Sequence, residues 1–547
     1  MIYLLRATVL ALICAAVTAG TAAASISGIA GFTPPALRGT PQFVLTGHGW
    51  GHGIGMSQYG AYGYAQKGFT FDQIVEHYYP GTDLTTTTVK NIRVLLGTGP
   101  SFTVSSTAPW KLRDGTAPAI TLKPGTVTLN PELKLKLPGE AKPETFAGPL
   151  TFSVAPTAAP LVFKKPYRGS FIVTSDGKAL TLVNAVPLDQ YLYGVVPSEM
   201  PFTWLPQALE AQAVAARSYA LAVRKTGPFD VYPDTRSQVY GGVSSEKESA
   251  NAAVDATSGK VLMYGGKAAF AYFFSTSGGR TAAIADVWNS APVPYLVSVP
   301  DPYDSISPYH DWGPFTFSAT QLAKALKARG RLLDVQTTVG PSERVTDTTA
   351  IGDKGQSTMA GIDVRAALGL RSTWFRIGVL ALDPLPAKVV PYGSAVTLTG
   401  LGRGLSDLRL EQRPADATAR TSVRAVRADA TGAFSIPFKA AGPADFRVVG
   451  GGLTSPETSL AVAPVVALKV AADYAALTGT IRPTLPGTSV QIQQANASGG
   501  WSTLARTTAL SSGRFSAVFD VTPGAYRARV ASAHGWAAAV SPKVVVG

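Results

Sequence analysis

The chain almost entirely lacks cysteine. Cys14 is the only cysteine among 547 residues, and it falls inside an apolar N-terminal segment. Once such a segment is removed the protein contains no thiol, which excludes disulfide bonds and thiolate metal sites. Ile13 stands where a lipoprotein signal has a small residue, and this argues against lipidation of Cys14.

Long hydrophobic runs are also missing beyond the N-terminus. Residues 1–24 combine Arg6, an apolar stretch and three small residues, Ala22 to Ala24, which is the pattern of an export signal. The apolar stretch is shorter than the roughly 20 residues that a membrane-spanning helix needs. The sequence therefore predicts a signal peptide and a secreted protein.

Charged residues are scarce, at 15% of the chain, and their signs are unbalanced. Lys and Arg number 48 against 34 Asp and Glu, which gives a formal net charge of +14. This balance favours an anionic partner such as a cell-wall polymer or a membrane surface. Because the basic residues are spread along the chain without a dense run, no nucleic acid partner is expected.

Glycine and proline are abundant, with 55 and 40 residues, and they predict many turns and substantial β content. Short strand patterns between residues 85 and 185 run into a helical segment, which predicts an α+β, β-rich main domain with a few helices. Weakly duplicated motifs near the C-terminus predict two small β-sandwich (Ig-like) modules. The expected divisions are a signal peptide at 1–24, a linker at 25–45, the main domain at 46–380, and the two modules at 385–464 and 465–547.

A single carboxylate stands out in the main domain. Glu199 lies between Pro197 and Pro201, which fix the backbone φ and predict a stiff turn. Pro206 suits the first position of the alanine-rich helix that follows. Apolar neighbours should raise the pKa of Glu199 and suit it to general acid catalysis. A solvent-exposed Glu in a helix-entry turn is the simpler interpretation.

A glycine-rich segment, GHGWGHGIGMSQYGA, begins at Gly47. Such a segment lets the backbone approach a ligand closely. Trp50 and Tyr59 offer faces for sugar rings, and Gln58 offers an amide for hydroxyl groups.

The two histidines of this segment have the spacing of metal ligands only if the segment is helical. His48 and His52 are four residues apart, but the density of glycine argues against a helix. Structural hydrogen bonding is therefore favoured over metal binding, and no cofactor is expected.

Two further polar segments complete the candidate site. Residues 234–242 place polar groups before a tight turn, and residues 272–281 contain three adjacent hydroxyl groups. No histidine and carboxylate stand in a recognisable triad with these hydroxyls, so we interpret them as substrate ligands or turn-formers. The candidate substrate-binding residues are Trp50, His52, Gln58, Tyr59, Gln238, Tyr240, Ser275, Thr276 and Ser277.

Together these segments resemble the SpoIID/LytB family of cell-wall proteins, a family linked to sporulation. The resemblance spans residues 46–378 and rests on GVVPSEMP with AQAVAARSYA, SQVYGG, STSGG with DVW, SPYHDW, LGLRSTWF and the glycine-rich segment. It implies that Glu199 is the catalytic acid of a lytic transglycosylase that acts on peptidoglycan glycan without stem peptides. Other members of the family are described as enhancers of an N-acetylmuramoyl-L-alanine amidase.

The chain departs from the family pattern in three places. The glycine-rich segment opens the domain instead of closing it, an order that still builds one site if the ends of the domain lie close together. Phe274 stands where many members have histidine. Ser237 stands where some members have a cysteine that binds zinc, so we expect no bound metal.

The resemblance leaves two functions open. A lytic transglycosylase cleaving MurNAc–GlcNAc bonds needs one carboxylate, here Glu199, whereas a hydrolytic glycosidase usually pairs two. Asp234, Asp286 and Asp304 are the candidates for a second carboxylate. The alternative is a non-catalytic murein-binding protein that stimulates a cell-wall amidase. Either function implies peptidoglycan glycan strands as a partner.

Overall fold

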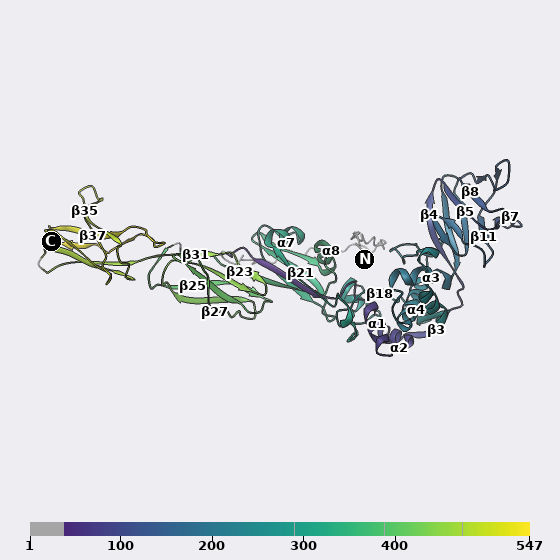
Figure 1. Ribbon diagram of the computed structural model, residues 1–547, viewed down its shortest axis with the longest axis horizontal. Helices are drawn as coiled ribbons and strands as arrows, with labels where there is room; N and C mark the ends of the chain where they lie inside the picture. Colours follow the sequence, from purple (N-terminus) through teal and green to yellow (C-terminus); the bar gives the residue numbers. More distant parts are fainter. Residues whose placement is uncertain (1–37, 289, 388, 473) are drawn as a thin grey trace.

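The computed structural model describes residues 38–547 except 289, 388 and 473. The predicted signal peptide, Cys14 and the first part of the predicted linker lie outside these residues. Figure 1 shows an elongated molecule, with a β lobe and a group of helices at one end and successive sheets leading to the C-terminus. The many sheets and few helices of the described residues agree with the α+β prediction. None of the described helices is long and apolar enough to cross a membrane.

The helical region is built around α4 (Pro206–Ala222). Pro206 occupies the first helical position, as predicted, and the alanines of α4 are buried, which lets neighbouring helices pack closely. These neighbours are α1 (Gln58–Gln66), α2 (Phe71–Tyr78), α3 (Leu188–Glu199) and α5 (Glu248–Ala256). The remaining elements of this region are α6 (Ile284–Trp288), the 3-10 turns η1 (Gly242–Ser245) and η2 (Asp304–Ile306), and strands β2 (Met56–Ser57), β3 (Asp83–Thr86), β16 (Lys260–Tyr264), β17 (Lys267–Ala268) and β18 (Phe273–Phe274).

Residues 91–187 form a β lobe inserted between α2 and α3. One sheet has the strand order β4-β15-β14-β11-β6-β7 and the other β13-β12-β5-β8. The predicted strand patterns form β4, β8, β14 and β15, because their apolar residues reach a shared core. The strands of the lobe are β4 (Asn91–Gly99), β5 (Phe102–Ser106), β6 (Trp110–Asp114), β7 (Ile120–Leu122), β8 (Gly125–Leu129), β9 (Lys134–Leu135), β10 (Glu144–Thr145), β11 (Leu150–Val154), β12 (Leu161–Phe163), β13 (Lys165–Tyr167), β14 (Ser170–Ser175) and β15 (Leu180–Pro187).

A second sheet region follows the helices. Its central sheet has the order β19-β1-β23-β25-β28, and a three-stranded sheet, β20-β21-β22, lies beside it. The elements are β1 (Gln42–His48), β19 (Asp311–Ser318), α7 (Ala319–Ala325), β20 (Leu332–Val339), β21 (Val345–Gly352), β22 (Gly355–Ala360), α8 (Gly361–Leu368), β23 (Phe375–Leu382), β25 (Ala395–Arg403) and β28 (Ala433–Lys439). Residues 42–45, placed in the linker by sequence, therefore belong to β1.

The predicted boundary near residue 384 does not separate two independent cores. β23 pairs with β1 on one side and with β25 on the other. Val44 and Leu380 pack in one apolar cluster with Leu398 and Phe434. A chain ending near residue 384 would expose that cluster to water, which is unfavourable in proportion to the apolar area uncovered.

The C-terminal strands repeat one packing arrangement at the duplicated motifs. Gly400 lies opposite Phe434, and Gly479 lies opposite Phe515. A Cβ added at either glycine would approach the phenylalanine ring to within 2.3 Å, so only glycine fits. The other strands are β24 (Val389–Pro391), β26 (Arg409–Pro414), β27 (Thr421–Ala425), β29 (Ala444–Gly450), β30 (Leu453–Thr454), β31 (Thr458–Ala463), β32 (Val465–Val470), β33 (Ala476–Arg482), β34 (Ser489–Ala495), β35 (Trp501–Thr508), β36 (Arg514–Val518), β37 (Gly524–Val530), β38 (Ala539–Val540) and β39 (Val544–Val546). Their Ig-like classification stays a prediction.

Candidate functional site

Glu199 is the last residue of α3. The flanking prolines had predicted a separate turn at this position, and that prediction is wrong. Pro197 lies inside the helix, where it removes one backbone hydrogen bond. The helix continues past it because the apolar face of α3, including Tyr191 and Val195, is buried in the core. The backbone becomes extended at Met200. Packing thus outweighs the lost bond, and the carboxylate projects from a helix end.

The side chain of Glu199 is half-buried and receives one hydrogen bond. The Val239 backbone N–H donates to its Oε1 at 3.4 Å. Burial raises the pKa of Glu199, and the bond from Val239 opposes this rise. Burial also raises the pKa of the Tyr191 and Tyr219 phenols, and the nearby charge of Glu199 contributes to both shifts. Glu199 therefore keeps its proton to higher pH than a free glutamate, as a general acid requires.

The glycine-rich segment lies against Glu199. The Gln58 amide donates to the backbone oxygen of Glu199 at 3.0 Å and to Gln212 Oε1 at 3.4 Å. Gln58 begins α1, and α1 packs on α4 directly after the Glu199 segment. The permuted chain order is therefore compatible with a single site.

Aromatic rings lie on one side of this site. Trp204, in the connection between α3 and α4, stacks on Tyr62 with ring centroids 4.5 Å apart and an interplanar angle of 8°. Tyr59 meets Trp204 edge-on at 4.8 Å. Phe202 and Leu205 are exposed nearby in the chain. Exposed apolar faces beside a carboxyl group suit the apolar face of a sugar ring.

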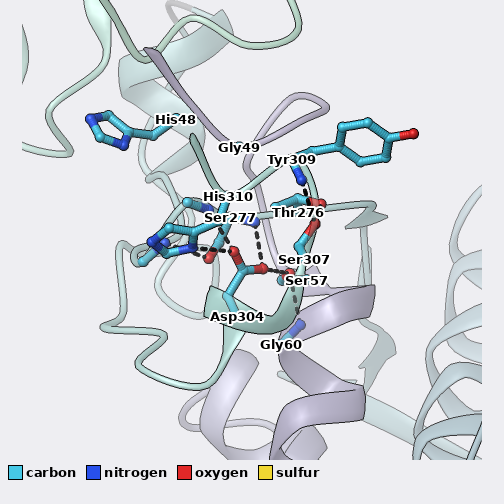
Figure 2. Close-up of polar contacts among 12 residues, drawn as sticks. His48, Gly49, Ser57, Gly60, Thr276, Ser277, Asp304, Ser307, Tyr309 and His310 are labelled. Carbon is cyan, nitrogen blue, oxygen red and sulfur yellow. Dashed lines mark hydrogen bonds and ion pairs between the residues drawn. The ribbon is translucent and has the colours of Figure 1, made fainter. Parts of the chain in front are cut away.

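Asp304 ties the glycine-rich segment to the hydroxyl-rich loop, as Figure 2 shows. It is fully buried, and its Oδ1 accepts from Ser57 Oγ at 2.7 Å and from the Ser277 backbone N–H at 2.9 Å. Its Oδ2 accepts from the Gly278 N–H at 2.9 Å and lies 3.1 Å from His310 Nδ1. Such a fully satisfied buried carboxylate serves to fix the loop.

The predicted hydroxyl ligands differ in accessibility. Thr276 and Ser277 are buried, and their hydroxyls bond to Ser307 Oγ at 2.8 Å and to the Gly279 N–H at 3.0 Å. In this arrangement both side chains hold the loop. Ser275 is half-buried, and its carbonyl accepts from the Tyr59 N–H at 3.0 Å. Its hydroxyl lies 3.2 Å from that of Thr276, and of the three it is the one that is not fully buried.

The segment containing Gln238 and Tyr240 contributes its backbone to the site. Gln238 is buried and accepts from the Tyr191 hydroxyl at 3.2 Å, while the buried Tyr240 hydroxyl donates to Asn184 at 3.0 Å. Val239, between them, is exposed and presents its N–H to Glu199. The alternation of a strand-like segment therefore points both predicted side chains away from the open surface.

His52 is held as a neutral ring among aromatic side chains. Its Nδ1 accepts from the Ile54 N–H at 3.0 Å, and its ring packs against Tyr272, Phe274 and Trp288. Burial and the charge of a nearby arginine lower its pKa to about 3.

The zinc site that the family resemblance raised does not fit these residues. Ser237 Oγ, at the position of the cysteine ligand, accepts from the Tyr232 N–H at 3.1 Å. Within the described residues, no group of three or more His, Cys, Asp or Glu side chains is arranged to hold a metal ion.

The three candidates for a second carboxylate are engaged elsewhere. Asp234 forms an ion pair with Arg236, and Asp286 accepts from the Ser342 N–H and hydroxyl. Asp304 binds the loop described above. Among the described residues, none of these three carboxylates shares a hydrogen bond with Glu199.

Sequence analysis missed Tyr62, Tyr219 and Tyr309. Tyr62 lies one helical turn after Gln58, so their i, i+4 spacing on α1 was an available signal. Tyr219 is near the end of α4, close to Glu199, and interrupts an alanine-rich sequence. Tyr309 belongs to the SPYHDW segment of the family resemblance, which was an available signal, but its contact with Trp50 depends on the fold.

Known proteins are similar to the region of the chain that contains Glu199. The family model described as Stage II sporulation protein matches residues 176–264. Stage II sporulation protein D of Bacillus subtilis (strain 168) is 34% identical over 247 residues, covering 40% of this chain and 68% of that protein. The protein of that name from Bacillus amyloliquefaciens is 37% identical over 219 residues, covering 35% and 60%. The amidase enhancer of Bacillus subtilis (strain 168) is 47% identical over 114 residues, covering 21% and 15%.

These matches indicate a protein with a role related to the cell wall. The chain belongs to the SpoIID/LytB family. It spans less than two thirds of the Bacillus amyloliquefaciens protein and of the amidase enhancer, so the activities of those whole proteins are not carried over by similarity.

Proposed function

We propose that the protein is an exported peptidoglycan lytic transglycosylase with Glu199 as its single catalytic carboxylate. The observation that carries the proposal is the environment of Glu199: a half-buried carboxyl with a raised pKa, one opposing hydrogen bond, and the phenols of Tyr191 and Tyr219 close enough to sense its charge. Membership of the SpoIID/LytB family supports a cell-wall substrate.

The proposed reaction begins with a protonated Glu199. The acid donates its proton to the glycosidic oxygen between N-acetylmuramic acid and N-acetylglucosamine, and the C1–O bond breaks. The resulting carboxylate takes the proton from the C6 hydroxyl of the muramic acid residue. That oxygen then bonds to C1 and forms a 1,6-anhydro ring. Because the nucleophile belongs to the substrate, no water and no second carboxylate are required.

Neighbouring groups support this assignment. The Gln58 amide fixes the backbone of Glu199, and the Val239 N–H holds Oε1. Tyr219, the one phenol of α4, lies close enough to sense the charge of Glu199. These groups orient the carboxyl group and are available to stabilise charge that develops in the transition state.

The decisive experiment is product analysis on denuded glycan strands. The wild-type protein should release strands ending in 1,6-anhydro-N-acetylmuramic acid, detected by mass spectrometry, and Glu199→Gln should release none. Reducing ends in place of anhydro ends would identify a hydrolase. Absence of turnover on every form of murein would refute the proposal.

A second function is favoured by one observation, the 47% identity with an amidase enhancer over 114 residues. In that case the protein binds murein and stimulates a separate N-acetylmuramoyl-L-alanine amidase. Stimulation would then survive Glu199→Gln, because it needs binding and no proton transfer. Loss of stimulation in a folded Glu199→Gln protein would reject this alternative.

A further inference from the structure

Arg371 lies on two aromatic rings at the surface next to the glycine-rich segment. Its guanidinium carbon is 4.6 Å from the ring centroid of Tyr309 and 5.4 Å from that of Trp50. Arg371 is half-buried, and Trp50 is 39% exposed. Arginine stacked on aromatic faces keeps its N–H groups free at the ring edge for a planar anion.

The guanidinium of Arg371 has no counterion or hydrogen-bond acceptor among the described residues. Four other arginines lie on aromatic rings in the described chain, and each of their guanidinium groups donates to a protein oxygen. The four are Arg168 to Glu246, Arg236 to Asp234, Arg344 to the Ser277 and Arg280 carbonyls, and Arg527 to Gln493. Arg371 is therefore placed like a structural arginine but lacks the partner that such a residue normally has.

The rings beneath Arg371 continue toward Glu199. Trp50 meets Tyr309 edge-on at 4.4 Å, and the Tyr309 phenol lies close enough to Tyr59 to add to the rise that burial causes in its pKa. Tyr59 in turn meets Trp204. We call these four residues, Trp50, Tyr309, Tyr59 and Trp204, the aromatic track. It runs from the Glu199 end of α3 to Arg371.

The backbone holds the Arg371 end of the track in place. Trp50 and Thr276 exchange two backbone hydrogen bonds, at 2.8 and 3.0 Å, and the Gly51 N–H donates to the Arg371 carbonyl at 3.0 Å. Gly51 has φ of +119°, which favours glycine there. A site fixed in this way loses little conformational entropy when it binds a ligand.

We propose that Arg371, on the rings of Trp50 and Tyr309, binds a carboxylate of the glycan strand at the far end of the aromatic track. This inference rests on the proposed glycan substrate but does not require catalysis. Two sources supply the same chemistry: the lactyl carboxylate of muramic acid in denuded strands, and the carboxylates of stem peptides where these remain. The aromatic track would hold the intervening sugar rings.

The test measures binding by the full-length Glu199→Gln protein, which leaves strands intact. The probes are denuded glycan oligomers, chitin oligomers of equal length that carry no carboxylate, and glycan oligomers that retain stem peptides. At low salt the protein should bind denuded oligomers about five- to tenfold more tightly than chitin oligomers. Adding Arg371→Gln should abolish this preference and change chitin binding by less than about twofold.

A matched control is Arg527→Gln, which removes an arginine stacked on Trp501 in the C-terminal module. It should leave the preference intact. If Arg371→Gln does not fold, as judged by thermal melting, Arg371→Lys replaces it and should reduce the preference at least about twofold, because the planar fork is lost.

Two outcomes would overturn the inference: a preference that survives both substitutions of Arg371, or one lost equally in Arg527→Gln. Equal binding of denuded and stem-bearing oligomers, lost together in Arg371→Gln, would show that either carboxylate is accepted. A wild-type protein that makes no anhydro product but shows the Arg371-dependent preference would reject the transglycosylase and leave this inference standing.

Discussion

Two carboxylates of the helical region have opposite environments. Asp304 is fully buried, yet it accepts hydrogen bonds from a hydroxyl and two backbone N–H groups and lies beside His310. Glu199 is only half-buried, yet it has one long hydrogen bond, and burial raises its pKa. The depth of burial therefore does not separate structural from chemical groups. What separates them is whether the folded protein satisfies the ionised form.

Asp301 shows a third combination. It is fully buried three residues before Asp304, and its carboxylate oxygens accept no well-aligned hydrogen bond from the described residues, although the hydroxyls of Ser277, Tyr78 and Ser57 lie close enough to oppose the rise in its pKa. Burial, followed by the charge of Asp304, raises its pKa to about 7. It lies against Gly60 and the Tyr78 hydroxyl, away from the surface. A buried carboxyl without access to substrate affects stability and not catalysis.

The largest expected effect is on the activity of Glu199→Gln. Removing the proton donor should lower the rate of strand cleavage about 10³-fold or more. Thermal stability should be unchanged or slightly higher, because the variant no longer buries an ionisable group with one weak hydrogen bond. In the wild-type protein the rate should fall as pH rises through the raised pKa of Glu199. Cleavage at various pH values and differential scanning calorimetry measure these effects. A large drop in the stability of Glu199→Gln would show that Glu199, like Asp304, has a structural role.

Asp304→Ala should have its main effect on stability, whereas Glu199→Gln affects activity. It leaves the N–H groups of Ser277 and Gly278 and the Ser57 hydroxyl without their acceptor, so the free energy of unfolding should fall by about 3–5 kcal/mol. The matched control is Asp311→Ala, whose carboxylate is 71% exposed and pairs with His48. That change should cost no more than about 1 kcal/mol. Urea titrations compare the two, and equal losses would contradict the assignment of Asp304.

Asp301→Asn should change how stability depends on pH. The folded protein holds the Asp301 proton up to about pH 7, while the unfolded chain releases it near pH 3.8. The folded state binds more protons between these values, so stability falls as pH rises through this window. The asparagine amide cannot ionise. The free energy of unfolding of the variant should therefore change by about 2–4 kcal/mol less than that of the wild-type protein over this pH range. Urea titrations at several pH values measure this difference. If the free energy of unfolding of both proteins varied in parallel between pH 4 and 8, Asp301 would be ionised throughout.

Trp204→Ala tests the aromatic side of the site. It removes the ring that stacks on Tyr62 and meets Tyr59, so binding of denuded glycan oligomers should weaken about tenfold. Catalysis at saturating substrate should change less, because Glu199 is retained. Tyr474→Ala removes a 57% exposed ring in the C-terminal module and serves as the control. An unchanged Kd for Trp204→Ala would exclude this ring from the site.

The smallest effects concern the net charge of +14. Retention of the protein on isolated cell walls should fall as salt is raised from low to above physiological concentration, because long-range attraction to anionic wall polymers is screened. Arg217 contributes nothing to this attraction, since it is fully buried and paired with Asp189. Sedimentation of protein with walls at several salt concentrations measures retention. Retention independent of salt would show that specific sugar contacts dominate.

Local sequence patterns predicted several elements well. Alternating apolar residues identified β4, β8, β14 and β15, and Pro206 marked the start of α4. These predictions succeeded because side-chain periodicity and proline geometry act within a few residues. The prediction of a turn from the prolines around Glu199 was wrong because it also considered only local geometry. Core packing keeps the backbone of α3 helical past Pro197.

The sequence by itself determined the residues available for chemistry: one carboxylate among apolar neighbours, a glycine-rich segment bearing Gln58, Tyr59 and Trp50, and no cysteine outside the N-terminal segment. Only the tertiary structure decided which of them meet. Gln58 and Glu199 are 141 residues apart, and Arg371 reaches Trp50 across more than half of the chain. Whether a hydroxyl is buried like Thr276 or a guanidinium left unpaired like Arg371 depends on such long-range contacts. No local pattern encodes them, because the energy of a polar group is set by the partners that the fold brings to it.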